Sequence, residues 1–490
     1  MTTLIKNGLI YDGAGNAPIK TDILIQDKKI VRLGSFPKKS ADSVIDATGM
    51  VVTPGLIDVN FEAEGAAGIL ADFHQENLIK RGVTTVMGGG SGISLAPVLN
   101  GSLNLIGEWG IAPRFNLSSQ SMEELLAVLK KRGVGVNFGT LVGYSSIRHF
   151  FTGGSDRDLT LREIESAKRL LGQSLREGAF GFSTGLIFPH SKAVPAREIL
   201  ELVREVKSRK RVYATHLRYE DARVLEALRE ILDIAETAGA SVEVSHFQPL
   251  GEFADFYETA LALIEKETAQ SNVNFDVFPH PVAMAPIYSL LPDWAKVSEL
   301  KGMLEILKYK DNKERILKHL QKIKIEDIAI AEVPPNLKFL EGMSLRDFAK
   351  NEGLTKARAL FGLMVLTGLR AKIFYGWTDR KILDKFLASQ RSIVTANYHH
   401  FTDERASAEN FFAWAERSGK LSLEKAIAKM TGLPAAKYSM ERRGLIKDGY
   451  AADIVFWENW KPKTVMINGS AAMRNGASER KLVGSVLKAG

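Results

Sequence analysis

Residues 211–246 read RVYATHLRYEDARVLEALREILDIAETAGASVEVSH, and the rest of the chain repeats their pattern. A short apolar strand, Arg211–His216, is followed by an amphipathic helical stretch within Asp221–Gly239 and by a second strand, Ser241–His246. Strands that alternate with helices are typical of a parallel sheet. Because both strands end in a histidine, one strand–helix–strand repeat apart, the two imidazoles are predicted to face the same end of the sheet.

The strand–helix alternation extends in both directions from this stretch. Eight segments are predicted to be strands: Leu56–Asn60, Val83–Gly88, Gly135–Val142, Phe180–Thr184, Arg211–His216, Ser241–His246, Val273–Phe278 and Arg391–Asn397. Eight such units predict an α/β fold, a (β/α)8 TIM-type barrel with insertions. A doubly wound open sheet is the alternative. It is less favoured because the glycines 88–90 lack the spaced dinucleotide-binding pattern.

The two ends of the chain are predicted to form a separate small β-sandwich. Residues 1–53 and 445–490 consist of short alternating strands broken by turns. The barrel is then expected over residues 54–444. It carries a mainly helical insertion at about residues 293–390, which is broken by two prolines at 334 and 335. A long insertion near the end of a barrel is commonly a lid over the site.

The composition excludes several classes of protein. Of 490 residues, 45% are hydrophobic and 25% are charged, as in ordinary globular proteins, and there is no cysteine. The net charge is +8, but the densest basic stretch, residues 296–327, mixes nine Lys/Arg with six Asp/Glu and reads as solvated helical surface. No segment resembles a membrane span or a signal peptide. We expect a cytoplasmic protein that binds neither nucleic acid nor membrane.

The chemistry is expected at the C-terminal ends of the barrel strands, where barrel enzymes place their active sites. His216 and His246 occupy two of these ends. Imidazole is a common metal ligand at such positions. The alternative is that each histidine only bonds a loop carbonyl, and the residues alone leave this choice open.

Several segments resemble the amidohydrolase superfamily, and within it the N-acyl-D-amino-acid deacylases, or D-aminoacylases. The resemblance covers nearly the whole chain in order. It rests on the segments 52–58 (VTPGLID), 178–186 (GAFGFSTGL), 215–218 (THLR), 245–246 (SH), 291–294 (LPDW), 421–435 (LSLEKAIAKMTGLPA) and 451–455 (AADIV).

This resemblance implies hydrolysis of an amide bond of N-acyl-D-amino acids. Zinc would polarise the carbonyl and activate a water molecule, and an aspartate at the end of the eighth strand would transfer the proton. The resemblance also implies four positions that contact the substrate. They are Ser183 and Thr184 of the signature segment, Gln248, and Arg405 after the eighth strand.

Several positions depart from the family pattern. Asn60 and Glu62 stand where the first strand has two histidines, and Ser91 stands where the family has a bridging cysteine. Asn397 replaces the aspartate, and Gln248 replaces a lysine associated with the substrate carboxylate. The Gly-His that follows the third strand in the family is Gly-Tyr here, at residues 143 and 144. An amide cannot act as a general base, and a serine is a poor substitute for a thiolate ligand.

Two interpretations follow. In the first, the barrel is impaired or inactive in the family reaction and binds a small molecule with an acyl-amide or carboxylate group. In the second, a hydrolase of non-peptide C–N bonds keeps one metal on His216 and His246, with Glu62 as a possible third ligand. Either way we expect at most one weakly bound divalent metal, or none.

The remaining polar groups near these strand ends are expected to be structural. They are Glu64, His280, His399 and His400. For Arg218, a salt bridge to Glu220 or Glu243 is expected.

Overall fold

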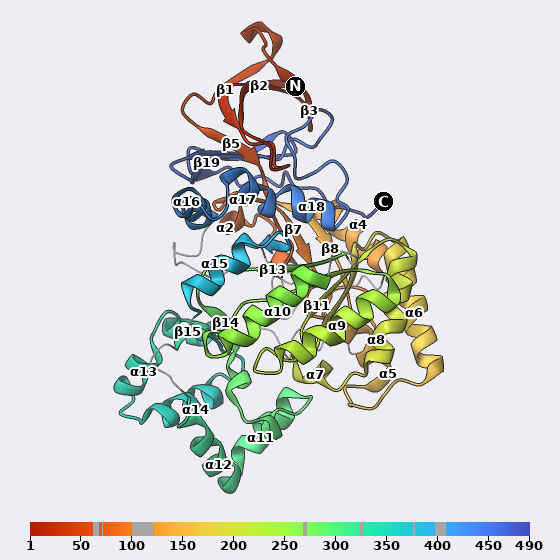
Figure 1. Ribbon diagram of the computed structural model, residues 1–490, viewed down its shortest axis with the longest axis vertical. Helices are drawn as coiled ribbons and strands as arrows, with labels where there is room; N and C mark the ends of the chain where they lie inside the picture. Colours follow the sequence, from red (N-terminus) through yellow and green to blue (C-terminus); the bar gives the residue numbers. More distant parts are fainter. Residues whose placement is uncertain are drawn as a thin grey trace.

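The structure is a computed structural model that describes residues 1–61, 68–70, 72–99, 121–267, 272–323, 328–375, 378–396 and 408–490. It has three parts stacked along the long axis of the molecule: a β-domain, a barrel and a helical insertion (Figure 1). The β-domain and the insertion lie at opposite ends of the barrel. In the described part of the chain no helix has the length and apolar character needed to cross a membrane.

The barrel is the (β/α)8 barrel that the sequence predicts. Its strands are β6 (Leu56–Asp58), β7 (Val83–Gly88), β8 with β9 (Asn137–Thr140 and Val142–Gly143), β10 (Gly181–Gly185), β11 (Val212–His216), β12 (Ser241–Val244), β13 (Val273–Val277) and β17 (Ser392–Val394). All their recorded pairings are parallel, in the orders β6-β7-β8 and β9-β10-β11-β12-β13-β17.

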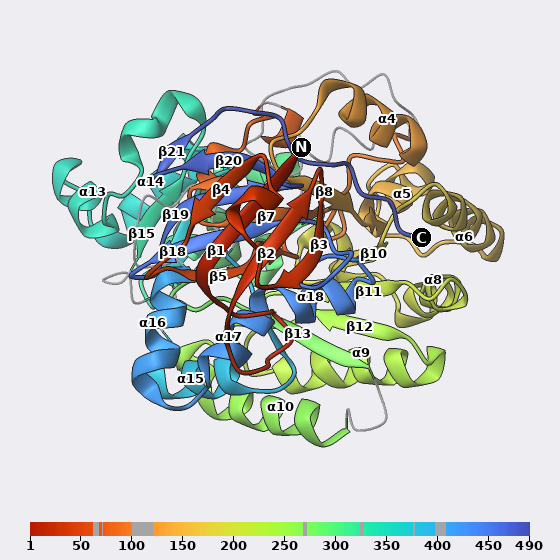
Figure 2. The ribbon, with the colours of Figure 1, turned by 90° about the horizontal axis from the view of Figure 1, so that it is seen from above.

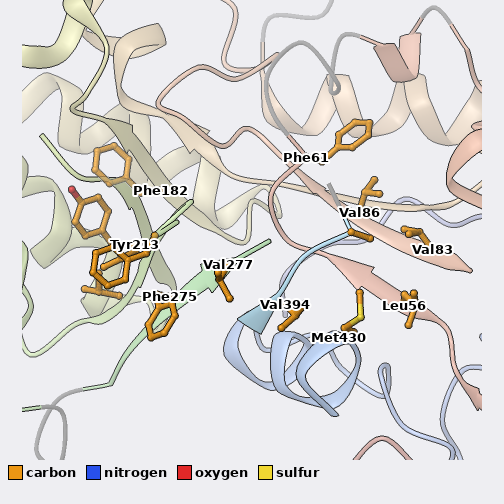
Figure 3. Close-up of a cluster of buried hydrophobic side chains, with 14 of the residues drawn as sticks. Leu56, Phe61, Val83, Val86, Phe182, Tyr213, Phe275, Val277, Val394 and Met430 are labelled. Carbon is orange, nitrogen blue, oxygen red and sulfur yellow. The ribbon is translucent and has the colours of Figure 1, made fainter. Parts of the chain in front are cut away.

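The first and last barrel strands meet beneath helix α17 (Leu423–Met430), which packs against both β6 and β17. Val394 of β17 and Met430 of α17 lie beside Leu56 of β6 (Figure 3). Inside the barrel, Ile57 and Ile393 belong to the same apolar cluster. This packing brings the two ends of the strand series together around a filled interior.

The outer layer of the barrel consists of amphipathic helices. These are α2 (Glu76–Ile79), α4 (Met122–Arg132), α5 (Tyr144–Thr152), α6 (Leu161–Arg176), α7 (Pro189–Lys192), α8 (Ala196–Ser208), α9 (Val224–Ala238), α10 (Ala254–Glu267), α15 (Arg380–Ala388), α16 (Ala408–Ser418), α17 and α18 (Gly432–Lys437). Helices α4 and α6 begin with capping boxes, on Ser121 and Thr160. Helix α9 ends at Gly239, which takes the left-handed conformation that favours glycine.

The β-domain is built from both termini, as expected. Its strands are β1 (Thr2–Ile10), β2 (Ile19–Gln26), β3 (Lys29–Gly34), β4 (Ser43–Asp46), β5 (Val51–Pro54), β18 (Ile454–Glu458), β19 (Lys461–Ile467), β20 (Ser470–Arg474) and β21 (Ala477–Ser478). β5 pairs with both β1 and β18, so one sheet contains strands from the N-terminal and the C-terminal segments (Figure 2). Isoleucines of β1–β3 share a core with Ile454, Phe456 and Met466.

The insertion folds around a core of its own. It contains α11 (Leu300–Lys308), α12 (Lys310–Leu320), α13 (Leu345–Asn351) and α14 (Lys356–Leu366), and its apolar side chains form a separate cluster. It also contains an antiparallel sheet of β14 (Ala283–Pro286), β16 (Lys372–Tyr375) and β15 (Ala329–Glu332). The sequence pattern predicts the helices but not this sheet.

The insertion is tied to the C-terminal ends of the barrel strands, here called the barrel mouth. The backbone N–H of Thr378 donates to the carbonyl of Pro281 at 2.7 Å, and its hydroxyl donates to the carbonyl of Pro249. Burial, and then the negative charge of Glu220 in the loop after β11, raises the pKa of Tyr375 on β16. The insertion therefore adjoins the mouth at β11–β13, where a lid would lie.

Candidate functional site

Two imidazoles meet at the barrel mouth. His216 is the last residue of β11, and His246 lies two residues beyond the end of β12. The parallel register, which pairs Thr215 with Val244, places both residues at the same end of the barrel. The ring centroids are 5.2 Å apart with an angle of 39° between the ring planes. The structure thus brings together the two histidines that the sequence identifies.

Ser91 contacts one member of this pair directly. Its Oγ lies 2.9 Å from Nε2 of His216, and both side chains are buried. Ser91 stands in the turn after β7, between Gly90 and Gly92, and has a φ of +58°. Non-glycine residues rarely adopt this left-handed conformation, and where they do the surrounding structure holds them in it.

Asn60 is held at the mouth by a carboxylate of β13. Its Nδ2 donates to both Oδ atoms of Asp276 at 3.2 Å. The same carboxylate accepts the backbone N–H of His246 at 3.1 Å. Asp276 thereby joins the first-strand position to the loop that carries the second histidine.

The sequence pattern does not reveal Asp276 or its buried neighbours Asp58 and Glu243 as part of the site. All three carboxyl groups lie in barrel strands and have no exposed surface. The available signal was an acidic residue in the middle of an apolar strand, as in Val273–Val277, which reads VNFDV. Buried carboxyl groups are rare unless paired, so an acidic residue at such a position indicates a buried polar partner.

Burial controls the ionisation of these three carboxyl groups. It raises the pKa of Asp58 to about 7, and the backbone N–H of Asn60 opposes this rise. It also raises the pKa of Asp276, against the opposing effects of His246 and the Asn60 amide. Burial and the negative charge of Asp276 raise the pKa of Glu243 well above its usual range. Burial therefore favours the protonated form of these carboxyl groups.

Ser183 and Thr184 use their hydroxyls inside the barrel wall. Ser183 Oγ donates to the carbonyl of Gly89 at 2.5 Å and accepts the N–H of Gly92 at 3.2 Å. Thr184 Oγ1 lies 2.8 Å from the hydroxyl of Tyr213 and 2.7 Å from that of Thr215. Ser183 thus fixes the turn that holds Ser91. Substrate contacts by either residue stay a prediction.

Gln248 ties the loops after β12 and β13 together. Its Nε2 donates to the carbonyl of His280 at 2.8 Å, and its Oε1 accepts the N–H of Phe278 at 3.0 Å. Both ends of the amide are therefore engaged with backbone. His280, expected to be structural, contributes its carbonyl to this tie.

The salt bridge of Arg218 differs from the expected one. Arg218 pairs with Glu230 of α9, at 2.6 Å between NH2 and Oε1, rather than with Glu220 or Glu243. Its guanidinium also donates to the carbonyls of Lys192 and Val194. Glu230 lies two turns into α9. Sequence spacing did not reveal that the face of α9 that carries Glu230 packs beside the end of β11.

Six predicted groups lie outside the described residues, so the structure does not place them. They are Glu62, Glu64, Asn397, His399, His400 and Arg405.

The described residues do not fit the zinc site that the resemblance implies. They contain no group of three or more His, Cys, Asp or Glu side chains arranged to hold a metal ion. Asn60 and Ser91 offer an amide and a hydroxyl, which are weak zinc ligands. Nε2 of His216 is engaged with the Ser91 hydroxyl instead.

Comparisons with known proteins agree with the fold. Residues 380–472 match the model of the Amidohydrolase family. Among relatives from Alcaligenes xylosoxydans xylosoxydans, an N-acyl-D-aspartate deacylase is 29% identical over 93% of this chain and 85% of its own length. A D-aminoacylase is 27% identical over 94% of this chain and 88% of its own length.

Solved structures show the same architecture. A crystal structure of D-aminoacylase matches with a TM-score of 0.79 and 24% identity, over 99% of each chain. An N-acyl-D-glutamate deacylase from Bordetella bronchiseptica, solved with zinc and a phosphonate inhibitor, matches with a TM-score of 0.81 and 23% identity, over 99% of each chain.

The barrel with its β-domain has the architecture of D-aminoacylase, and the match over residues 380–472 makes the chain similar to the Amidohydrolase family. Over most of its length its sequence is similar to that of N-acyl-D-amino-acid deacylases, or D-aminoacylases.

Proposed function

We propose that this protein binds a small acyl-amide or carboxylate compound at the barrel mouth but does not carry out the metal-dependent hydrolysis of its family. The observation that carries the proposal is the engagement of the mouth groups with one another. The Ser91 hydroxyl bonds His216, and the Asn60 amide bonds Asp276, at positions where the family binds metal. Groups satisfied in this way offer little to a cation.

The residue at the proton-transfer position also supports the absence of the family reaction. Asn397 stands at the position of the family's aspartate, and an amide cannot accept a proton near neutral pH. Loss of a general base typically lowers a rate by about 10²–10⁴-fold. Loss of a metal-activated water lowers it further.

The direct test measures amine release from N-acyl derivatives of D-aspartate, D-glutamate and D-methionine, with added zinc and with a chelator. We expect little or no turnover in either condition, and substoichiometric metal by elemental analysis. Robust turnover that the chelator abolishes would refute the proposal. Binding is measured separately, as an increase in Tm with the same compounds.

Reversion variants separate the causes of the loss. Asn397→Asp alone is expected to restore nothing, because the metal ligands are still missing. The combination of Asn60→His, Glu62→His, Ser91→Cys and Asn397→Asp has a better prospect, since residues that act as one unit are not additive. Gln248 is then expected to keep substrate binding weak.

One observation favours a second candidate, a hydrolase with a single metal. The 5.2 Å separation of the His216 and His246 rings is compatible with both imidazoles binding one ion. Zinc titration by calorimetry tests this. Binding of one equivalent that is abolished by His246→Gln, together with zinc-dependent amide hydrolysis, would favour this candidate over the first.

A further inference from the structure

We propose that Ser91 and His216 form a nucleophile–base pair that transfers acyl groups without a metal. This inference rests on the proposed function, because it requires a mouth that admits an acyl compound and an Nε2 of His216 that holds no metal. The substrates would be compounds with a good leaving group, namely aryl esters or thioesters. The first observation is the 2.9 Å distance between Ser91 Oγ and His216 Nε2, which is the reach a general base needs.

The backbone of Ser91 is the second observation. Its φ of +58° places a non-glycine residue in the left-handed region, in the turn that follows β7. Nucleophilic serines of another fold class stand on a strained turn after a strand, which presents the hydroxyl. The chain lacks that class's sequence motif, so the likeness concerns only the geometry of the turn. Strain of this kind collects at functional sites.

Ser183 of β10 holds the turn that carries Ser91 in place. The carbonyl of Gly89 accepts the Ser183 hydroxyl, and the N–H of Gly92 donates to that hydroxyl. The ring of His216 has two ring neighbours, Phe188 at 5.4 Å and His246 at 5.2 Å between centroids. Both members of the pair are therefore positioned by neighbours, as preorganised catalytic groups are.

Space and hydrogen-bond donors are present beside Ser91. Among the described atoms, a Cβ added to Gly90 would meet only Asn60 Oδ1 within 4 Å, at 3.5 Å. In the same part of the chain, no acceptor is recorded for the backbone N–H of Gly90 or of Ser91. Adjacent N–H groups of this kind can stabilise the oxyanion of a tetrahedral intermediate.

The reaction balances with water as the only co-reactant. Ser91 Oγ bonds to the acyl carbon while its proton passes to His216 Nε2. The bond to the leaving group breaks, and that group takes the proton from His216. Water then attacks the acyl-Ser91 ester and gives its proton to His216, which returns it to Ser91 Oγ as the free acid departs. A good leaving group is needed because the imidazolium is the only acid in this scheme.

The test uses diisopropyl fluorophosphate, which phosphorylates activated serines, on the full-length protein in the presence of a chelator. Intact mass and peptide mapping should show one adduct, on Ser91. Ser91→Gly, which suits the left-handed backbone, should fold and take no label. His216→Gln should be labelled at least about 100-fold more slowly. The matched control is Ser145→Ala, whose hydroxyl contacts Ser191 at 2.7 Å, and it should label as the native chain does.

Hydrolysis of p-nitrophenyl acetate gives a second readout. The native chain should release p-nitrophenol with a burst close to one equivalent, and Ser91→Gly should show no burst. An unlabelled native chain, an adduct on another serine, or an undiminished rate in His216→Gln would overturn the inference. Such a result leaves the proposed function standing, whereas chelator-sensitive amine release from N-acyl-D-amino acids would refute the proposed function itself.

Discussion

Ser91 shows how one residue can combine strain with a specific contact. Its left-handed backbone is unfavourable for any residue with a Cβ, by about 1–2 kcal/mol. Glycines on both sides let the turn form, and the hydrogen bond to His216 holds the side chain inside it. The two effects can be separated by substitution.

Two variants of Ser91 measure the strain directly. Ser91→Ala and Ser91→Gly both lose the hydroxyl, so they differ only in tolerance of a positive φ. We expect the glycine variant to be more stable than the alanine variant by about 1 kcal/mol in urea unfolding. Equal stability of the two variants would show that the turn relaxes and stores no strain.

Burial of His190 is expected to make the stability of the folded protein sensitive to acid. Burial, and then the positive charges of His149 and Arg148, lower its pKa to about 3. The unfolded side chain has a pKa near 6.5, so between these values the unfolded state binds the extra proton. Stability is therefore lost as the pH falls below about 6.5, by up to about 1.4 kcal/mol per pH unit.

The His190→Gln variant checks this linkage. Its free energy of unfolding, measured by urea from pH 7 to pH 4, should fall less steeply with acid than that of the native chain. The two curves should diverge only below about pH 6.5. Parallel curves would mean that His190 titrates normally in the folded protein.

At the residue level, the sequence revealed positions but not partners. His216 and His246 were placed at the mouth because strand ends of a barrel face one way, and the family resemblance placed Asn60 and Ser91 there. The hydrogen bond from Asn60 to Asp276 joins residues 216 positions apart, and no local pattern encodes it. Polar contacts across a barrel depend on side-chain direction in three dimensions, which hydrophobic periodicity does not report.

At the level of elements, the loops after β12 and β13 depend on one amide. Gln248 accepts from Phe278 and donates to His280, and it is 8% exposed. A lysine has no acceptor and cannot make both bonds. Gln248, at the position where the resemblance implies a lysine, therefore has a structural role.

Gln248→Lys should consequently destabilise the protein rather than restore substrate binding. It leaves the N–H of Phe278 without its partner and adds a charge at a buried position. The expected loss is about 1–3 kcal/mol in urea unfolding. The exposed Gln26→Lys substitution in β2 is the control and should change stability by less than about 0.5 kcal/mol. A Gln248→Lys variant of native stability would show that the two hydrogen bonds of Gln248 contribute nothing to the free energy of unfolding.

The barrel strands were predicted well, and the strands of the insertion were missed. Each predicted barrel strand overlaps an observed one, because apolar runs bounded by glycine and polar residues are a strong signal. The strands of the insertion have four residues each, and Ala329–Glu332 reads AIAE, which no period distinguishes from helix. Their pairing depends on β16, which follows β15 by about forty residues of helical sequence.

Across the whole molecule, one buried asparagine joins three parts of the chain. Asn137 of β8 donates to Asp453 at 3.0 Å, in the segment leading into the β-domain strand β18. Its Oδ1 accepts from Asn468 of the β-domain at 2.8 Å and from the backbone N–H of Ser485 in the C-terminal tail at 2.9 Å. Asn137 therefore forms a polar junction that the barrel, the β-domain and the C-terminal tail share. No sequence motif predicts this junction.

Asn137→Ala is expected to be among the most destabilising single substitutions in the chain. Asn137 has no exposed surface, so its removal leaves buried groups of Asn468 and Ser485 short of a partner where water does not easily replace it. We expect a loss of about 2–4 kcal/mol of unfolding free energy. Asn16→Ala, which removes an exposed amide bonded to Asp12, should cost less than about 0.5 kcal/mol and serves as the matched control. Hydrogen exchange locates the effect: protection should fall in β8, at Asn468 and in residues 483–489 together. A loss confined to β8 would show that the junction does not couple the three parts.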